Sequence, residues 1–196
     1  LGNQPLANSL LKEQGKAETY PLDLYQCQHC TLLQLGKVVP KEEMYEEYYY
    51  IPSVAKTGLK HFKRLAQKLV GTLRLKKNSL VVDIGGNDGS LLNEFKKKKM
   101  KVLNIEPAKN IQVLPGIETI RGYFNESMAR SAVTWAGRAK LVTATNVFAH
   151  VDDLQEFLRA LDILLDEDGV FFAQFPDARN LLKENQFDTI YHEHLS

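Results

Sequence analysis

The fold of this chain is decided by the stretch Val81-Val82-Asp83-Ile84-Gly85-Gly86-Asn87-Asp88-Gly89-Ser90-Leu91-Leu92. A short β-branched run ends in Asp83 and a glycine-bracketed loop, and an apolar pair then opens a helical pattern. This order predicts a strand, a loop and a helix, an arrangement in which a ligand can approach backbone amides at the helix N-terminus. The next expected strand, 102–105, leads into Glu106, about 20 residues after the loop, where a ribose diol is normally held. The stretch therefore predicts a nucleotide-type ligand.

The glycine spacing narrows the class of ligand. Nicotinamide and flavin sites use G-x-G-x-x-G and P-loops end in Gly-Lys-Ser/Thr, and neither pattern is present. The loop instead resembles the acidic-x-Gly-x-Gly-x-Gly loop of S-adenosylmethionine (SAM) methyltransferases, with Asn87 in place of the middle glycine. SAM has no phosphate, so Gly85, Asn87 and Gly89 need only let the loop pass close to its methionine part. Asp83 is expected to hold the amino group, and Glu106 both ribose hydroxyls. The alternative is a glycine turn without a ligand.

Composition and charge limit the classes of protein that fit. The 196 residues could hold one ordinary domain, or one domain and a small module. No apolar run approaches the length of a membrane span, and the N-terminus lacks a signal-peptide pattern. The formal net charge is +1, and the lysine run 96–99 closes an expected helix, where it complements the helix dipole. We therefore expect a cytoplasmic protein without nucleic-acid or membrane partners; the oligomeric state stays open, a monomer included.

Strand and helix patterns alternate from residue 78 onward. The expected strands are 80–84, 102–105, 118–120, 141–145 and 170–175, and the expected helices are 90–99, 126–135 and 154–165. This alternation is typical of a doubly wound α/β domain, and with the glycine loop it predicts a Rossmann-like SAM methyltransferase sheet. Such a sheet normally has more strands, so we expect a fragment with a truncated sheet. A start at Leu1 without a methionine and an end at Ser196 fit that expectation.

Cys27 and Cys30 are candidates for one of two sites: half of a metal site, or a complete redox pair. A redox pair belongs at the N-terminus of a helix. Here residues 31–35 alternate like a strand, which is typical of a zinc knuckle. A structural zinc site needs four ligands, and this pair supplies two, so the others are expected upstream of Leu1. His29 is expected to point outward. Two ordinary reduced cysteines, suited to a reducing cytoplasm, are the alternative.

The chain divides into three expected regions. Residues 1–45 are part of an N-terminal zinc-binding module. Residues 46–78 are a helical connector that contributes to the substrate site, since apolar residues recur at helical spacing from about 42 to 71. Residues 79–196 are the SAM-binding methyltransferase domain, incomplete at its C-terminus.

Polar residues in two segments are candidates for chemistry. Asn146 follows the expected strand 141–145, and ligands of open α/β sheets bind beyond the carboxyl ends of strands. His150, in the same loop, is either a site residue or a capping or packing residue. The segment Tyr191-His192-Glu193-His194 combines two histidines, a carboxylate and a phenol. Metal binding is disfavoured, because residues i and i+2 of a helix face different ways. Proton transfer by an oriented histidine is favoured, and a polar surface turn is the alternative.

Taken together, the motifs resemble those of the sugar C-methyltransferases, which act on nucleotide-linked 4-keto deoxysugars. The resemblance extends over essentially the whole chain. It rests on Gln4-Pro5-Leu6-Ala7-Asn8, Tyr20-Pro21-Leu22, Cys27-x-x-Cys30, Asp83-Ile84-Gly85-x-Asn87-Asp88-Gly89, Glu106-Pro107-Ala108, Asn146-Val147-Phe148-Ala149-His150 and Tyr191-His192-Glu193-His194.

This resemblance implies a zinc-binding domain with two cysteine pairs, a SAM-binding domain, and a C-terminal domain that helps hold the sugar nucleotide. The first cysteine pair and the C-terminal domain would lie outside this chain. It also implies that His194 is the base, that Tyr191 and Glu193 are its companions, and that Tyr50 belongs to the Tyr-x-Tyr-x-Ser-Ser segment. Pro52 replaces the first serine of that segment, a departure that bears on the identity of the sugar.

The predicted reaction is SAM-dependent C-methylation at C3 of a nucleotide-linked 4-keto deoxysugar. A proton next to a carbonyl must be removed before carbon can attack a methyl group, so a base is needed. His194 is expected to remove it, with Tyr50 or Tyr191 hydrogen-bonded to the enolate oxygen. The alternatives are an O- or N-methyltransferase acting on another small molecule, and a non-catalytic SAM- or zinc-binding scaffold.

Overall fold

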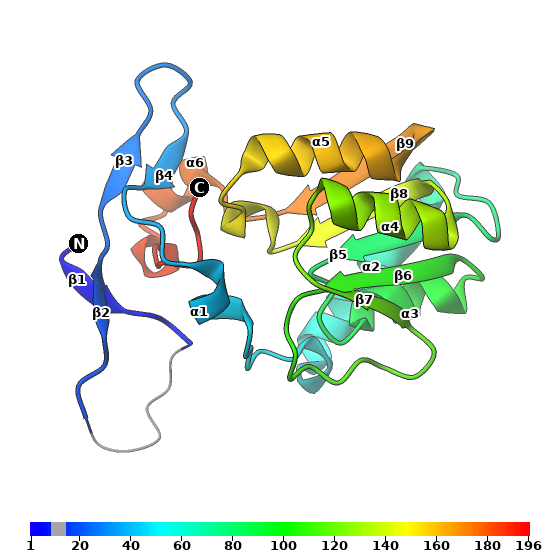
Figure 1. The fold of residues 1–196 in the computed structure, drawn as a ribbon, viewed down its shortest axis with the longest axis horizontal. Helices are drawn as coiled ribbons and strands as arrows, with labels where there is room; N and C mark the ends of the chain where they lie inside the picture. Colours follow the sequence, from blue (N-terminus) through cyan, green and yellow to red (C-terminus); the bar gives the residue numbers. More distant parts are fainter. Residues whose placement is uncertain (9–14) are drawn as a thin grey trace.

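The computed structural model describes residues 1–8 and 15–196, and Figure 1 shows two regions. At one end lie two antiparallel β-hairpins. Their strands are β1 (Asn3–Pro5) paired with β2 (Thr19–Pro21), and β3 (Leu24–Gln26) paired with β4 (Leu33–Leu35). At the other end lies an α/β domain. The alternating pattern over residues 31–35 thus corresponds to an observed strand, β4.

The connector between the two regions is not continuously helical. Helix α1 (Lys41–Tyr45) and helix α2 (Lys56–Thr72) are separated by extended residues and by a 3-10 turn over Pro52–Val54. The helical pattern expected over 42–71 is therefore wrong in its middle part. The physical reason is Pro52, which lacks an N–H and keeps the preceding residue, Ile51, extended at φ −126° and ψ 112°.

The α/β domain is built on a five-stranded parallel sheet in the order β7-β6-β5-β8-β9. Its strands are β5 (Leu80–Ile84), β6 (Lys101–Glu106), β7 (Glu118–Arg121), β8 (Ala139–Thr145) and β9 (Leu165–Gln174). All were expected from the sequence, although β9 begins earlier, because Leu165 pairs with Ala139 across an irregularity in the β8–β9 register. The predicted Rossmann-like α/β fold is confirmed.

Helices cover both faces of the sheet (Figure 1). Helices α2 and α3 (Ser90–Lys97) pack on one face, and α4 (Glu126–Ala136) and α5 (Leu154–Leu164) pack on the other. Strand β5 has β6 on one side and β8 on the other. The strand order therefore reverses next to β5, and the carboxyl ends of β5 and β8 flank the crevice where such sheets bind ligands. No helix in the described part of the chain is long and apolar enough to cross a bilayer.

The burial of β5 explains why its sequence is apolar except for Asp83. All of its residues are buried, because a central strand of a parallel sheet is covered on both faces. Val81 belongs to the apolar cluster formed with α2 and α3, whereas Val82 belongs to the cluster formed with α4 and α5. Successive residues of one strand thus anchor both helical layers.

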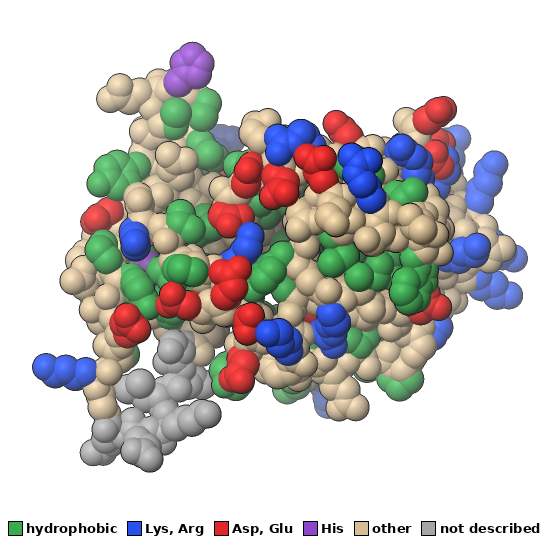
Figure 2. Space-filling view, in the orientation of Figure 1, with side chains coloured by type: hydrophobic (Ala, Val, Ile, Leu, Met, Phe, Trp, Pro, Cys, Tyr) green, Lys and Arg blue, Asp and Glu red, His purple; other side chains and the backbone are tan. Residues whose placement is uncertain are grey.

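The lysine run 96–99 lies at the end of α3, as expected, but the helix ends at Lys97. Lys96, Lys97 and Lys99 are exposed, and Lys97 forms an ion pair with Glu94 one turn earlier. Figure 2 shows Lys and Arg side chains reaching into solvent at the end of the molecule far from the hairpins. Cations in the last turn of a helix interact favourably with the helix dipole, and this interaction explains the lysine run without a binding partner.

The end of the chain lies between the two regions. It comprises α6 (Ala178–Lys183), a 3-10 turn (Phe187–Thr189) and the irregular residues 190–196. The N–H of Leu195 donates to the carbonyl of Ala149, just after β8, at 2.7 Å, and the N–H of Leu35 in β4 donates to the carbonyl of Leu195 at 2.9 Å. The Leu195 side chain is buried in a small cluster with Leu22 and Leu35. Both regions therefore hold this segment.

Replacing Phe95 by alanine should lower the free energy of unfolding by about 3–5 kcal/mol, because the ring is fully buried where α2, α3 and the sheet meet. Urea denaturation followed by circular dichroism measures the loss. Phe187→Ala is the matched control, since that ring is 52% exposed, and its cost should stay below about 1 kcal/mol. Equal losses for the two variants would contradict the assignment of this cluster as core.

Candidate functional site

The loop after β5 has a left-handed backbone at three positions, with φ of +62° at Gly85, +52° at Asn87 and +79° at Gly89. A Cβ atom at Gly85 would lie 2.6 Å from the Val147 side chain, so a larger residue would clash. Asparagine tolerates this backbone region better than most residues. That tolerance explains how Asn87 can occupy the position of the middle glycine.

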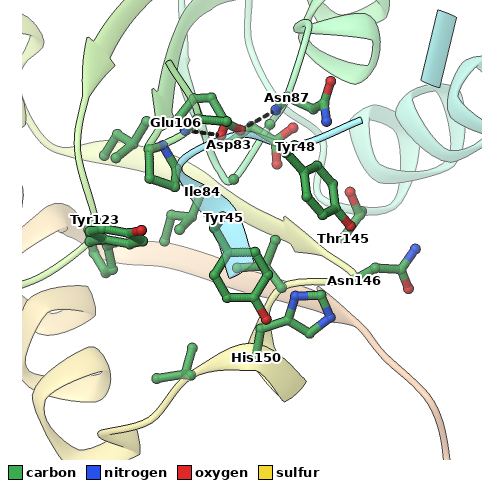
Figure 3. Close-up of a pocket in the computed structure, with 18 of the residues that line it drawn as sticks. Tyr45, Tyr48, Asp83, Ile84, Asn87, Glu106, Tyr123, Thr145, Asn146 and His150 are labelled. Atoms are coloured by element: carbon green, nitrogen blue, oxygen red, sulfur yellow. Dashed lines mark hydrogen bonds between the residues drawn. The ribbon is translucent and has the colours of Figure 1, made fainter. Parts of the chain in front are cut away.

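Glu106, at the end of β6, is hydrogen-bonded to this loop. Its Oε2 accepts from the N–H of Asn87 at 2.8 Å and its Oε1 from the N–H of Ala108 at 2.8 Å (Figure 3). Burial raises the pKa of Glu106, and the two hydrogen bonds oppose that rise. Each oxygen keeps a further lone pair. The carboxylate can therefore still accept hydrogen bonds from a ligand in the cavity that it lines.

Asn104 in β6 supports the loop from beneath, and sequence reasoning did not identify it. Its side chain is fully buried, and its Nδ2 donates to the carbonyl of Asn87 at 3.0 Å. The available signal was an amide inside an otherwise apolar strand, since a buried polar side chain is costly unless it is hydrogen-bonded. Asn104 fixes the backbone of the residue whose N–H binds Glu106.

The side chain of Asp83 is buried beneath the loop that follows β5. Its side chain is 1% exposed and accepts a hydrogen bond from Thr143 Oγ1 at 2.6 Å. Burial raises the pKa of Asp83 to about 7, although the Thr143 hydrogen bond opposes the shift. A Cβ atom at Gly86 would lie 2.8 Å from Asp83 Oδ2, so the loop backbone covers the carboxylate closely.

A cavity lies over the carboxyl ends of β5, β6 and β8 (Figure 3). The residues predicted to bind the cofactor that line it are Asp83, Gly85, Asn87, Glu106 and Asn146. Gly89 is not among the lining residues; it forms the turn into α3, where a Cβ atom would approach Ile117 to 3.0 Å. The structure thus brings all but one of the predicted cofactor residues to one cavity.

The connector supplies tyrosines to the same cavity. Tyr45, Tyr48 and Tyr50 line it, and Tyr50 is also 55% exposed. The backbone carbonyl of Tyr50 accepts a hydrogen bond from Asn87 Nδ2 at 2.8 Å. Of the predicted catalytic residues, only Tyr50 lines this cavity.

His194 lies in a hydrogen-bonded chain that defines its protonation. Its Nδ1 is 2.7 Å from the carbonyl of Thr189, and its Nε2 is 3.0 Å from the hydroxyl of Tyr191. A carbonyl can only accept, so Nδ1 carries the proton and Nε2 accepts from the phenol. Burial lowers the pKa of His194, and the Thr189 hydrogen bond opposes the shift. The neutral ring, with a lone pair on Nε2, is therefore the form present at neutral pH.

His150 and Tyr45 connect His194 to the cavity. The rings of His150 and Tyr45 stack at 5.5 Å with an interplanar angle of 7°, and the rings of His150 and His194 are 5.3 Å apart. Burial lowers the pKa of His150 to about 4, and the nearby His194 adds to the shift. His150 does not cap α5, because Asp153 does so by accepting from Glu156 N–H. It packs at the cavity wall, and a site role for it stays a prediction.

Glu193 is 3% exposed and is bonded from three directions. Its Oε1 accepts from Asn8 Nδ2, its Oε2 accepts from the hydroxyl of Tyr48 at 3.3 Å, and its carbonyl accepts from the hydroxyl of Tyr45 at 3.3 Å. Burial raises the pKa of Glu193, while the bonds from Asn8 and Tyr48 oppose the rise. Sequence reasoning missed the parts played by Asn8, Tyr45 and Tyr48. The only signals were the motif ending in Asn8 and the run of tyrosines before α2.

The cysteine pair lies in the turn between β3 and β4. The N–H of Thr31 donates to the carbonyl of Cys27 at 2.9 Å, and both thiols are free. Backbone N–H groups of Cys30 and His29 hydrogen-bond the Cys27 sulfur and lower the pKa of its thiol. Such a turn suits a knuckle in which Cys27 and Cys30 would hold a structural zinc. Among the residues described, no group of three or more His, Cys, Asp or Glu is placed to hold a metal. His29 is exposed, as expected.

Each of the two regions matches a known protein family. Residues 58–196 match the family described as "Methyltransferase domain", and residues 1–45 match the family described as "Putative zinc binding domain". The chain therefore belongs to the SAM-dependent methyltransferases, with an N-terminal zinc-binding domain. SAM and zinc, both expected from the sequence, are the cofactors that these families use.

Individual relatives indicate the type of methyltransferase. The C-methyltransferase NovU of Streptomyces niveus is 36% identical over 201 residues, covering 100% of this chain and 48% of NovU. The chain thus spans about half the length of that curated relative, and the resemblance to the C-methyltransferases is confirmed. A SAM-dependent methyltransferase from Archaeoglobus fulgidus superposes with a TM-score of 0.55 at 15% identity, covering 69% of this chain and 62% of that one. This second likeness concerns the fold alone.

SAM binding should weaken about tenfold when the pH is lowered from 8 to 6. The reason is that Asp83, with a pKa raised to about 7, becomes neutral below that pH and would lose the attraction that we expect it to have for the SAM amino group. Isothermal titration calorimetry across this range measures the change.

Asp83→Asn should bind SAM more weakly and lose most of this pH dependence. Asp162→Asn, at an exposed position of α5, is the control and should behave as the unmodified protein. An affinity of the unmodified protein that does not change with pH would contradict the proposed contact.

Proposed function

We propose that this chain contains the reaction centre of a SAM-dependent C-methyltransferase that methylates C3 of a nucleotide-linked 4-keto deoxysugar. The observation that carries the proposal is the Tyr191–His194–Thr189 chain, which keeps a half-buried, neutral histidine beside the cavity wall with its acceptor nitrogen, Nε2, bonded to a phenol. The 36% identity to a C-methyltransferase supports the same reaction type.

A neutral base is what methylation at carbon requires. An oxygen or nitrogen substrate brings its own lone pair, whereas a carbon next to a carbonyl must first lose a proton. His194 Nε2 accepts the C3 proton, and the electron pair of the C–H bond moves onto the carbonyl oxygen to give an enolate. Bound SAM supplies the electrophilic methyl group of its sulfonium. The low pKa of His194 keeps the base neutral near pH 7.

Tyr191 provides the matching hydrogen bond to the enolate. In the resting site its hydroxyl donates to His194 Nε2 at 3.0 Å. When the substrate carbonyl binds, the Tyr191 hydroxyl turns from Nε2 to the carbonyl oxygen. This change frees the Nε2 lone pair to accept the C3 proton and leaves Tyr191 donating to the enolate oxygen. Tyr50, which lines the cavity, is the second phenol that can serve this oxygen. Glu193 is the remaining predicted catalytic residue, and it takes part by accepting a hydrogen bond from Tyr48.

The cofactor contacts follow from the cavity. Asp83 holds the amino group of SAM, Glu106 accepts from the ribose hydroxyls, and the loop residues Gly85 and Asn87 pass along the methionine part. Gly89 sets the turn into α3, and Asn146 offers an amide at the end of β8. These roles rest on the shared lining of one cavity by residues from three strands.

The remaining expectations are consistent with this reaction. Cys27 and Cys30 hold a structural zinc together with ligands from elsewhere in the complete protein. The two free thiols suit a reducing cytoplasm, where nucleotide-linked sugars are made. The partner of the site is the ketosugar itself, and no macromolecular partner is needed for the chemistry.

His194→Asn in the complete protein should lower the methylation rate by at least about a hundredfold, because asparagine cannot accept the C3 proton. SAM affinity should stay unchanged, since His194 is outside the cofactor cavity. Methyl transfer from labelled SAM and calorimetry measure the two quantities. His29→Asn, an exposed histidine, is the matched control and should keep the full rate.

Exchange of the C3 hydrogen separates this proposal from O- or N-methylation. The protein should catalyse exchange of that hydrogen with deuterium from the solvent when the ketosugar is supplied with S-adenosylhomocysteine, and His194→Asn should abolish it. Methylation without any exchange at C3, or a near-normal rate for His194→Asn, would sink the assignment of the base.

A further inference from the structure

The N-terminal motif Gln4-Pro5-Leu6-Ala7-Asn8 ends inside the reaction centre. Asn8 follows β1, and its side-chain amide donates to Glu193 Oε1 across 185 positions of sequence. Asn8 is partly buried, and Glu193 is 3% exposed. A residue of the hairpin region thus touches the carboxylate next to the proposed base.

A second contact joins the hairpin region to the same turn. His192, which precedes Glu193, is 1% exposed, and its Nε2 donates to the carbonyl of Tyr20 in β2 at 3.2 Å. The rings of His192 and Tyr20 also meet edge to face, 6.0 Å apart. The β1–β2 hairpin region therefore contacts two consecutive residues of the turn, His192 and Glu193, and it forms a wall of the site rather than a separate unit.

The hydrogen bonds of Glu193 determine its ionisation. Burial alone favours the neutral acid, and no lysine or arginine within residues 1–8 and 15–196 forms an ion pair with this carboxylate. The Tyr48 hydroxyl can donate or accept, so it can pair with either form of Glu193. The Asn8 Nδ2 group only donates, so it stabilises the carboxylate. Both bonds lower the pKa of Glu193, and the Asn8 bond contributes more than the Tyr48 bond.

That charge acts on the neighbouring phenols. The groups that face Glu193 are Tyr45 and Tyr48 from the connector and Tyr191 from its own segment, and after burial the Glu193 charge raises the pKa of each. The phenols are thereby kept protonated, as a donor to an enolate oxygen must be. His194 also lies in this segment, and its pKa is lowered mainly by burial.

We propose that Asn8 is a positioning residue of the active site: its amide holds the Glu193 carboxylate, and Glu193 in turn orients Tyr48 and the turn that carries His194. This inference rests on the proposed function, since it concerns the same reaction centre. Asn8 does not touch the reacting atoms. It acts through Glu193, whose Oε2 accepts from Tyr48 and whose carbonyl accepts from Tyr45.

Two substitutions of Asn8 in the complete protein test the inference. Asn8→Leu removes the donor at similar size and should lower kcat by about tenfold to a hundredfold while leaving the KM for SAM unchanged. Asn8→Asp places two carboxyl groups together, and only when they share a proton does the new side chain donate as the amide did. Its kcat should therefore rise as the pH is lowered from 8 to 6.

The direction of that pH profile is diagnostic. The unmodified protein should not gain rate as the pH falls, because its base, His194, works in the neutral form. A gain in rate is therefore specific to Asn8→Asp. Asn3→Leu and Asn3→Asp, at an exposed position of the same hairpin, are matched controls and should keep the normal kcat and profile. A wild-type kcat for Asn8→Leu, or parallel pH profiles for Asn8→Asp and Asn8→Leu, would overturn the inference.

Infrared spectroscopy gives a readout that does not need turnover. At pH 7, Asn8→Leu should show more protonated-carboxyl absorption than the unmodified protein, and this additional band should disappear when Glu193→Gln is combined with Asn8→Leu. Asp83, whose pKa is about 7, contributes the same absorption to all three proteins and cancels in the difference spectra. Absence of this band in Asn8→Leu would also overturn the inference. If the unmodified protein fails to methylate or exchange the ketosugar while the band behaves as expected, the proposed function fails and the role of Asn8 in holding Glu193 stands.

Discussion

The reaction centre depends on the backbone of Leu195, which joins the two regions of the molecule. Its N–H donates to Ala149 just after β8, and its carbonyl accepts from Leu35 in β4. Both bonds are between backbone groups, and the buried Leu195 side chain seals them against water. Because these contacts flank the turn that carries His194, they place the proposed base between the hairpins and the cofactor cavity. The ring contact between His150 and His194 adds to this attachment of the turn to the α/β domain.

Hydrogen bonds rather than close ion pairs hold the buried carboxylates of the site. Asp83, Glu106 and Glu193 are all buried, and within the described residues none forms an ion pair. Thr143, two backbone N–H groups and Asn8 supply hydrogen bonds instead. Such bonds offset only part of the cost of burying charge. A cationic ligand would supply the rest, and SAM carries positive charge on its sulfonium and its amino group.

The two halves of the site differ in how they are built. The cofactor half comes from one strand–loop–helix unit and the next strand, so Asn87 and Glu106 meet only 19 positions apart. The proposed catalytic half is assembled from remote segments, since Tyr45 reaches Glu193 across 148 positions. Local geometry therefore secures cofactor binding, whereas the proton-transfer groups depend on the whole chain being folded.

The sequence by itself determined the five strands, the three helices of the α/β domain and the cofactor loop, because periodicity and left-handed backbone positions such as Asn87 are properties of neighbouring residues. It did not determine the break in the helical connector at Pro52. The apolar spacing on both sides of Pro52 is helical, whereas Pro52 itself lacks an N–H. Only the tertiary structure decided that Asn8 and Tyr48 meet Glu193, and that His150 packs between the cavity and the proposed base. Those contacts arise from packing of distant segments, and no local pattern encodes which distant side chain fills the space.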